Sequence, residues 1–161
     1  MYKQLTPSLT LIKSSSFPLS FDQKRKTHQV TVGVGGNVGK IKYRLEHLIH
    51  LLKRDRQLSL HASSPILKNP PFGFTDQDDF HNAVLIVSTN LNARAFLLHL
   101  LAIEKKFGRK RSFKNAPRTL DLDMIFFDDV VMNHKDLTLP HPAWSNRESV
   151  LIPLAYVHKH T

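Results

Sequence analysis

The sequence predicts an α+β domain, a ferredoxin-like βαββαβ sandwich with a β-hairpin appended to it. Three observations predict this class. Four segments have the alternating or continuously apolar pattern of strands, and two have apolar residues at helical spacing. Each helical segment also lies between two of the strand segments. The length of 161 residues suits one domain with its own core.

The first half of this order is a strand, a turn, a helix and a second strand. Residues 29–34 read QVTVGV, an alternating β-branched strand that ends in two glycines. Asn37 follows where a helix N-cap belongs. A second strand is expected over residues 58–67. The apolar stripe of the helix between them is Ile41, Leu45, Leu48 and Leu52.

The second half begins with a long loop and ends with the hairpin. Residues 69–76 read NPPFGFTD, a run of turn formers that predicts a loop. Residues 81–89 contain a continuous apolar run typical of a central strand. A second amphipathic helix is expected over residues 93–107, ended by a glycine. Residues 120–127 predict the fourth strand, and residues 128–139 the hairpin.

Composition and charge exclude several classes of function. The chain has no cysteine, so any metal must be held by oxygen or histidine ligands. The formal net charge of +10 indicates an anionic partner, which is a nucleic acid, an acidic lipid or a phosphorylated small molecule. No stretch has the ~20 apolar residues of a membrane helix, and no secretory signal is evident. We therefore expect a cytoplasmic protein with no membrane partner.

Residues 1–28 differ in composition from the rest of the chain. They are Ser-rich and carry five basic residues against one acidic residue, a net charge of +4. We expect them to form a loosely ordered extension ahead of one domain over residues 29–161.

Two acids in the fourth strand are the sharpest chemical feature. Asp121 and Asp123 lie two residues apart, so both side chains should project from the same face of the strand. Two such carboxylates repel each other and lose hydration unless a cation offsets them, and Mg²⁺ suits oxygen ligands of this kind. The alternative is a solvated strand face paired with Arg118. The residues expected on the opposite face are Leu120, Leu122, Met124 and Phe126.

A basic cluster lies just before these acids. Arginine donates to phosphate oxygens in pairs, and positive charge stabilises phosphoryl transfer. The alternative is a solubilising or nucleic-acid-binding surface. Because the cluster adjoins two acids on a strand, we favour a site for a polyphosphate. Its members are Arg109, Lys110, Arg111, Lys114 and Arg118.

One histidine differs from the others in the chain. His141 stands between Pro140 and Pro142, which restrain it in an extended turn. Fixed geometry suits a ligand contact, although the motif taken alone favours a purely structural role.

Together these motifs resemble those of the 6-hydroxymethyl-7,8-dihydropterin pyrophosphokinases, the HPPK family. The resemblance extends from about residue 29 to residue 156, and its most specific part is Ala116-Pro117-Arg118-Thr119-Leu120-Asp121-Leu122-Asp123. The other matching motifs are Val34-Gly35-Gly36-Asn37, Asn69-Pro70-Pro71-Phe72-Gly73, Asp76-Gln77, Phe80-His81-Asn82-Ala83, Ile103-Glu104, Gly108-Arg109, Pro140-His141-Pro142 and Asn146-Arg147.

The resemblance implies an enzyme of folate biosynthesis that transfers pyrophosphate from ATP to 6-hydroxymethyl-7,8-dihydropterin and releases AMP. It implies two Mg²⁺ ions held by Asp121 and Asp123. The catalytic residues would be these two acids with Arg109, Arg111 and Arg118. The ATP site would comprise Glu104, Arg109, Arg118, His141 and Arg147. The pterin site would comprise Asn69, Pro70, Pro71, Phe72, Phe80, Asn82 and Asp121, with Asn82 on the hydrogen-bonding edge of the pterin and Phe80 stacked on its ring.

The resemblance also implies a mobile loop over residues 109–116 and a monomer that binds small molecules and no nucleic acid. Three positions depart from the family pattern. Ser149 replaces a phenylalanine that often completes the ring sandwich, so Phe72 is a candidate for that role. Asn115-Ala116 replaces a Trp-Gly pair, and Leu101 replaces a glutamine.

Two other functions remain open from the residues alone. A small basic nucleic-acid-binding domain fits the charge, but the central strand is aliphatic where an RNA-binding sheet needs aromatic residues. A pseudoenzyme or interaction scaffold on the same fold is the other alternative.

Overall fold

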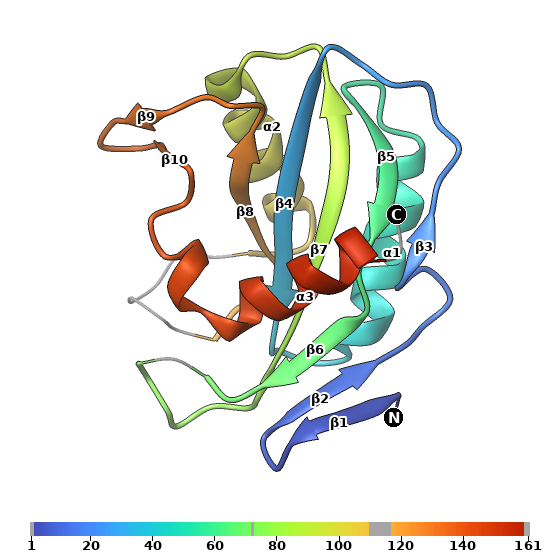
Figure 1. The fold of residues 1–161 in the computed structure, drawn as a ribbon, viewed down its shortest axis with the longest axis vertical. Helices are drawn as coiled ribbons and strands as arrows, with labels where there is room; N and C mark the ends of the chain where they lie inside the picture. The colour runs from blue at the N-terminus through green and yellow to red at the C-terminus, as the bar shows by residue number, and fades with distance from the viewer. Residues whose placement is uncertain (1, 72, 110–116, 160–161) are drawn as a thin grey trace.

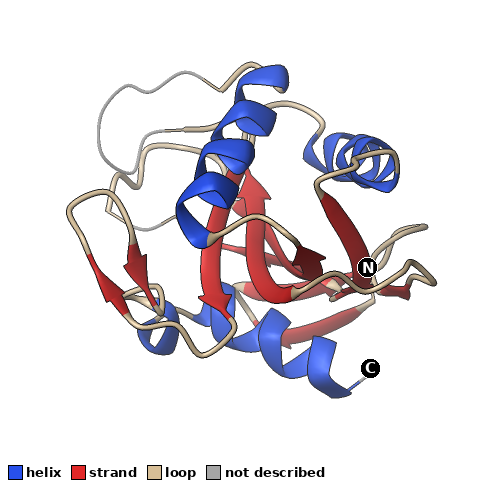
Figure 2. Cartoon of the chain, turned by 90° about the horizontal axis from the view of Figure 1, so that it is seen from above, coloured by secondary structure: helices blue, strands red, loops and turns tan. Residues whose placement is uncertain are grey.

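The computed structural model describes residues 2–71, 73–109 and 117–159 of the chain. One sheet has helices on both of its faces (Figure 1), so the predicted α+β class is confirmed. Seen from above, two helices cover one face and a third crosses the other (Figure 2). Within the described residues the helices are α1 (Ile41–Lys53), α2 (Ala93–Lys106) and α3 (Glu148–Lys159), and a short 3-10 turn, η1 (Trp144–Asn146), precedes α3.

The middle of the sheet comes from the strands that the sequence predicts. The central strand β7 (Phe80–Thr89) pairs antiparallel with β4 (His28–Gly36), and β4 pairs antiparallel with β8 (Asp121–Phe127). On its other side β7 pairs with β5 (Leu58–Ser63) and then with β6 (Ile66–Asn69). The one strand expected over residues 58–67 is therefore two, divided at Ser64-Pro65, where proline has no N–H to donate.

The larger core lies between the sheet and the pair α1 and α2. The valines of β4 alternate toward these helices, and Val30, Val32 and Val34 are buried there. The predicted stripe of α1 is buried against them, as are Phe96, Leu100 and Ile103 of α2.

The start of α1 corrects one prediction. Asn37 is not the N-cap, because the helix begins at Ile41 and is preceded by Lys40. The chain turns through Gly39, whose φ of +71° suits a glycine, and this turn separates Asn37 from the helix. In α2 the N-cap is Asn92, whose side chain accepts a hydrogen bond from Ala95 N at 2.9 Å.

A β-bulge in β8 corrects another prediction. The β4–β8 register shifts between Thr31 and Val32, so that Ile125 is an extra residue and the alternation changes after it. Met124 faces the larger core as expected, but Phe126 does not. It packs on the α3 side, with its ring centroid 5.0 Å from that of Trp144.

Residues 1–28 are the largest departure from expectation. Instead of a loose extension, they form β1 (Lys3–Thr6), β2 (Leu9–Ile12) and β3 (Leu19–Ser20). Strand β2 pairs antiparallel with both β1 and β6, and β3 pairs with β5, so these strands belong to the same sheet. Phe17 is fully buried in the larger core.

The C-terminal part of the chain carries the predicted hairpin and a helix that the sequence analysis missed. The hairpin consists of β9 (Met132–Asn133) and β10 (Thr138–Leu139), as expected over residues 128–139. Helix α3 packs on β7, where Leu154 and Val157 contact the cluster of Val84 and Ile86. Within the part of the chain that the structure describes, no helix is long and apolar enough to cross a membrane.

Candidate active site

A cleft lies on the α3 side of the sheet, between β4, β7, β8 and the start of α3. Its empty volume, which includes solvent at the open mouth, is about 670 Å³. It is lined by Gly33, Val34, Gly35, Asn69, Phe80, Asn82, Ala83, Arg118, Asp121, Asp123, Ile125, His141, Arg147, Ser149 and Val150.

The floor of the cleft depends on two glycines of β4. Gly33 lies opposite Asp123 and Gly35 opposite Asp121 in the β4–β8 register. A Cβ on Gly35 would lie 2.1 Å from Oδ1 of Asn82, so only a glycine leaves room for that side chain. A Cβ on Gly33 would come no closer than 3.4 Å to Ile125, an ordinary contact.

Asp121 is held between two arginines. Arg109 Nη1 donates to Oδ1 at 2.8 Å, and Arg118 Nη1 donates to Oδ2 at 2.9 Å. Each of the three side chains is only about one-fifth exposed, so these ion pairs are better shielded from water than surface pairs are. Arg109, just after α2, and Arg118, just before β8, thus place two cations on the first acid of the strand.

The second acid experiences the opposite balance of charge. Burial raises the pKa of Asp123 to about 7, and the charges of Asp121 and Glu104 add to the rise. Arg118 and Arg147 oppose it without cancelling it. The positive charge near Asp123 is therefore too small to offset the cost of an ionised carboxylate at this position.

Glu104 lies behind this pair, at the end of α2. Its buried carboxylate accepts a hydrogen bond from Leu122 N at 2.7 Å, so it binds the backbone between the two acids. Its Oε2 also lies 3.9 Å from Arg109 Nη1. Glu104 and Arg109 do not line the cleft, and they act on it through Asp121 and the backbone of β8.

The other wall of the cleft is formed by β6 and β7. Asn82 Nδ2 donates to Asn69 Oδ1 at 2.7 Å, which fixes the orientation of both amides. The guanidinium carbon of Arg118 lies 5.3 Å from the ring centroid of Phe80, within the range of a cation–π contact. One arginine therefore contacts both the acid on one wall and the aromatic ring on the other.

Asn37 connects two segments beside the cleft, one that contains Gln77 and Asp78 and one that contains Arg118. Its Nδ2 donates to Gln77 Oε1 at 2.8 Å and to Asp78 O at 2.9 Å. Its Oδ1 accepts from Arg118 N at 3.0 Å, and its own N–H donates to Arg118 O at 3.0 Å. The side chain is buried, so these bonds cannot be replaced by water at no cost.

The segment before α3 contributes the last two polar groups. His141 N donates to Ile125 O at 2.9 Å, and His141 Nδ1 accepts from Ala143 N at 3.1 Å. Burial and the nearby charge of Arg147 lower the pKa of His141, against the opposing effect of Asp121. A neutral imidazole and a guanidinium thus face the cleft from this side.

Residues 31–159 match the family described as 7,8-dihydro-6-hydroxymethylpterin-pyrophosphokinase (HPPK). The chain belongs to the HPPK family.

Three relatives are named 2-amino-4-hydroxy-6-hydroxymethyldihydropteridine pyrophosphokinase. One from Helicobacter pylori is 43% identical over 148 residues, covering 90% of this chain and 91% of its own. One from Campylobacter jejuni is 42% identical over 147 residues, covering 90% and 93%. One from a Synechocystis strain is 38% identical over 140 residues, covering 87% and 70%.

The arrangement of acids fits the divalent cation expected for an HPPK. Asp121 and Asp123 supply hard oxygen donors, and the raised pKa of Asp123 reflects a shortage of positive charge that a cation would relieve. Over residues 2–71, 73–109 and 117–159, no group of three or more His, Asp or Glu side chains is placed to hold a metal by itself. Such an ion would therefore take its remaining ligands from water and from a bound phosphate.

Most of the residues expected in this HPPK site lie together. Asn69, Phe80, Asn82, Arg118, Asp121, Asp123, His141 and Arg147 line the cleft. Glu104 and Arg109 support it from behind β8. Pro70 is exposed and Pro71 partly exposed, and neither lines the cleft. Arg111, Phe72 and most of the loop over residues 109–116 lie outside the described residues.

Sequence reasoning did not assign several lining residues to the site, namely Gly33, Val34, Gly35, Ala83, Ile125 and Val150. Gly33 could have been found from its spacing of two from Gly35, because both then face the same side of β4. Ile125 could have been found from its spacing of two from Asp123 along β8, whereas Val150 lines the cleft only because α3 exists. Ser149 does line the cleft, at the position where a phenylalanine is common in the family.

Proposed function

We propose that this chain transfers the pyrophosphoryl group of ATP to the hydroxymethyl group of 6-hydroxymethyl-7,8-dihydropterin, as a step of folate biosynthesis. The hydroxymethyl oxygen attacks the β-phosphorus of ATP. The bond from that phosphorus to the oxygen that bridges it to the α-phosphorus breaks, so AMP leaves and the hydroxyl proton is released. The observation that carries this proposal is the pair Asp121 and Asp123 on one strand face, beside three arginines.

We expect the cationic residues to bind the ATP phosphates. Arg118 and Arg147 line the cleft together with the two acids, and Arg109 approaches from behind. Guanidinium groups bind phosphate oxygens in pairs, and their charge stabilises the charge spread over a transferred phosphoryl group. We assign the ATP phosphates to these arginines and to His141, with Arg111 as a further catalytic residue of the loop.

We expect the pterin to bind against the wall formed by β6 and β7. The pterin ring is flat and presents donors and acceptors along one edge. Phe80 offers an aromatic ring, and the amides of Asn82 and Asn69 are already oriented by their hydrogen bond. Preorganised polar groups beside a ring suit such a ligand.

Two Mg²⁺ ions would be held by Asp121 and Asp123 together with phosphate oxygens. Bound there, Mg²⁺ neutralises charge on the phosphates. The chain's own residues keep these two carboxylates on one face of β8 and fix the backbone between them through Glu104.

We also propose that the enzyme works as a monomer in the cytoplasm. The acids, arginines and amides that we assign to the substrates all belong to this chain.

The experiment measures AMP formed from ATP and Mg²⁺, with and without 6-hydroxymethyl-7,8-dihydropterin. We expect pterin-dependent AMP, reduced about a hundredfold or more in Asp121→Asn and in Asp123→Asn. Asp128→Asn is the matched control, because it makes the same charge change just after β8, away from the cleft. AMP formed equally well without pterin, or a folded protein that forms no AMP and binds nucleic acid, would contradict the proposal.

A further inference from the structure

The N-terminal strands lie against the two elements that carry opposite sides of the cleft. Strand β2 extends the sheet beyond β6, with Thr10 opposite Lys68 and Leu11 opposite Leu67 (Figure 1). Asn69, the last residue of β6, lines the cleft and accepts the hydrogen bond from Asn82. The β2 pairing therefore ends one residue from a side chain of the cleft wall.

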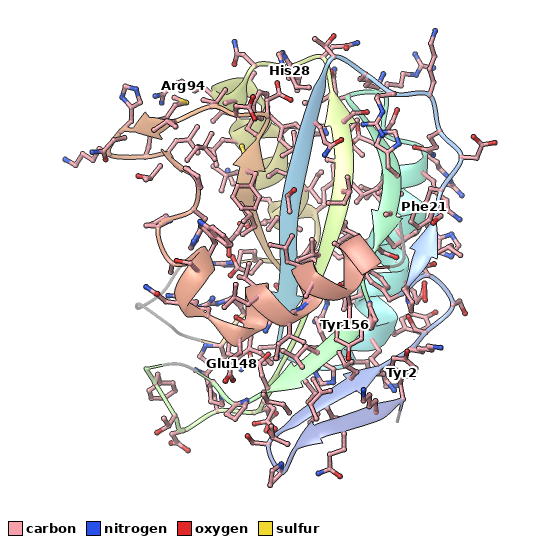
Figure 3. The ribbon with its side chains drawn as sticks, in the orientation of Figure 1. Tyr2, Phe21, His28, Arg94, Glu148 and Tyr156 are labelled. Atoms are coloured by element: carbon pink, nitrogen blue, oxygen red, sulfur yellow. The ribbon has the colours of Figure 1, made fainter. Side chains whose placement is uncertain are left out.

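The same strand also covers part of α3. Leu9, Leu11 and Leu67 form a buried cluster of their own, against which Ile152 and Tyr156 of α3 pack. Figure 3 shows Tyr156 on the half of α3 away from Glu148, above β6 and the N-terminal strands. This cluster is separate from the one that joins α3 to β7. Because α3 follows directly after Arg147, its seating sets the position of that residue beside the cleft.

The sequence of the segment suits this role. Leu9 and Leu11 alternate with the polar Thr10, which is the pattern of a strand with one buried side. The HPPK match begins at residue 31, so these strands lie outside the region that defines the family. The matches to the Helicobacter and Campylobacter relatives leave only about a tenth of the chain uncovered, so they extend into residues 1–28.

We propose that β1 and β2 are a positioning element of the active site, in which Leu11 joins β6 on the pterin side to α3 on the phosphate side. This inference rests on the proposed function for the identity of the two ligands. Leu11 touches neither ligand and acts through Asn69 and Arg147. A small shift of either residue away from its ligand weakens binding, because geometry near the reacting groups is demanding.

Phe17 supplies a matched control within the same N-terminal segment. Its side chain is fully buried like that of Leu11, but it lies in the larger core with the α1 residues, and the adjacent Ser16 N donates to Glu46 of α1 at 2.7 Å. Ile66, the first residue of β6, shares that core, but Leu67 does not. Substitution of Phe17 by alanine therefore removes an N-terminal anchor without removing a member of the cluster beneath α3.

The experiment compares Leu11→Ala, Leu11→Met and Phe17→Ala in the full chain, below the melting temperature of each variant. We expect Leu11→Ala to raise the KM for the pterin and for ATP about 5- to 10-fold, with kcat within about threefold. Leu11→Met keeps most of the buried volume and should restore both KM values to within about twofold. Phe17→Ala should lower the melting temperature and leave both KM values within about twofold.

Hydrogen exchange supplies a readout that does not depend on catalysis. In Leu11→Ala, the amides of residues 67–69 and 150–156 should exchange faster, while Phe17→Ala should leave them unchanged. Unchanged KM values in folded Leu11→Ala, or equal rises in Phe17→Ala, would overturn the positioning role. If no variant and no wild-type protein forms pterin-dependent AMP, the proposed function has failed, and the exchange data still decide whether Leu11 joins β6 to α3.

Discussion

Arg118 Nη1 donates to Asp121 Oδ2 at 2.9 Å, so a residue assigned to phosphate is paired with a residue assigned to Mg²⁺. Without ligands, this ion pair offsets part of the charge of Asp121, which still raises the pKa of Asp123. With a metal and ATP bound, each partner has a stronger counterion available. We therefore expect the two side chains to exchange each other for these counterions when the ligands bind.

Replacement of Arg118 tests this exchange. We expect Arg118→Ala to lower kcat/KM by about 10²- to 10³-fold, because a charge aimed at the transferred phosphoryl group is lost. Steady-state kinetics with saturating Mg²⁺ measure the effect. Arg94→Ala is the control, since Arg94 forms an exposed ion pair with Asp136 near the hairpin, away from the cleft. Equal activity of the two variants would show that Arg118 does not contact the phosphates.

The ionised carboxylate of Asp123 should lower the free energy of unfolding of the ligand-free enzyme at neutral and alkaline pH. Its folded pKa of about 7 lies above the ordinary value of 3.8, so the folded state binds the proton more tightly. The stability that this group contributes is complete below about pH 4 and is lost as the pH rises through 7. We expect Asp123→Asn to raise the free energy of unfolding by roughly 1 kcal/mol or more at pH 8 without Mg²⁺, and by far less at pH 4.

Urea unfolding at pH 4, 6 and 8 measures this difference, with Asp128→Asn as a control of opposite sign. The hydrogen bond from His28 lowers the pKa of Asp128, against a small effect of burial, and the bond from Gln29 N adds to the lowering. Its stabilising contribution is therefore present above the ordinary pKa and lost as the pH falls. Asp128→Asn should thus destabilise the protein at pH 8. A destabilised Asp123→Asn at pH 8 would contradict the repulsion that we infer.

Most of the elements from β4 to β8 could be predicted, because the pattern of each one lies within its own stretch of sequence. Alternation, helical spacing and glycine at the ends are properties of neighbours in the chain, and the two acids of β8 share a face by the same period of two. The N-terminal strands lack such a signal, because β1 and β2 are only four residues each and join the sheet through the pairing of β2 with β6. Helix α3 was hidden by Pro153, which usually ends a helix.

The site was predictable in its residue types and less so in its arrangement. Asn37 illustrates the reason, since an asparagine after a strand suits an N-cap and a loop-fastening role equally well. Only the positions of Gln77 and Arg118 in space decide between these roles. The bulge at Ile125 is likewise invisible in the sequence, because it depends on how β4 and β8 pair.

Gly35 is the position at which a single methyl group should damage the pterin side. A Cβ there would lie 2.1 Å from Asn82 Oδ1 and 3.0 Å from His81 O, so Asn82 must move. We expect Gly35→Ala to raise the KM for the pterin at least about tenfold and to cost about 2 kcal/mol of stability. Gly33→Ala, with 3.4 Å to its nearest neighbour, should cost much less stability. Calorimetry and pterin titration measure the two effects, and a pterin KM left unchanged by Gly35→Ala would remove Asn82 from the binding site.

Asn37 should be sensitive even to a nearly isosteric change. In Asn37→Asp the acceptor toward Arg118 N remains, but both donors are lost, and a carboxylate oxygen then faces Gln77 Oε1 and Asp78 O. Because the side chain is buried, we expect Asn37→Asp to destabilise the protein by roughly 2–3 kcal/mol and to lower kcat/KM as Arg118 shifts.

The partner variant Gln77→Glu separates the two contributions. It keeps the acceptor for Asn37 Nδ2 but loses the Nε2 donor that bonds Phe74 O on the exposed side of the loop. Because the bond to Asn37 survives, we expect Gln77→Glu to cost less than about 1 kcal/mol and to leave kcat/KM within about threefold. Urea unfolding and steady-state kinetics compare the two variants. If Gln77→Glu lowered the stability and kcat/KM as much as Asn37→Asp does, the loss of the hydrogen bond between Asn37 and Gln77 would not explain the effect of Asn37→Asp.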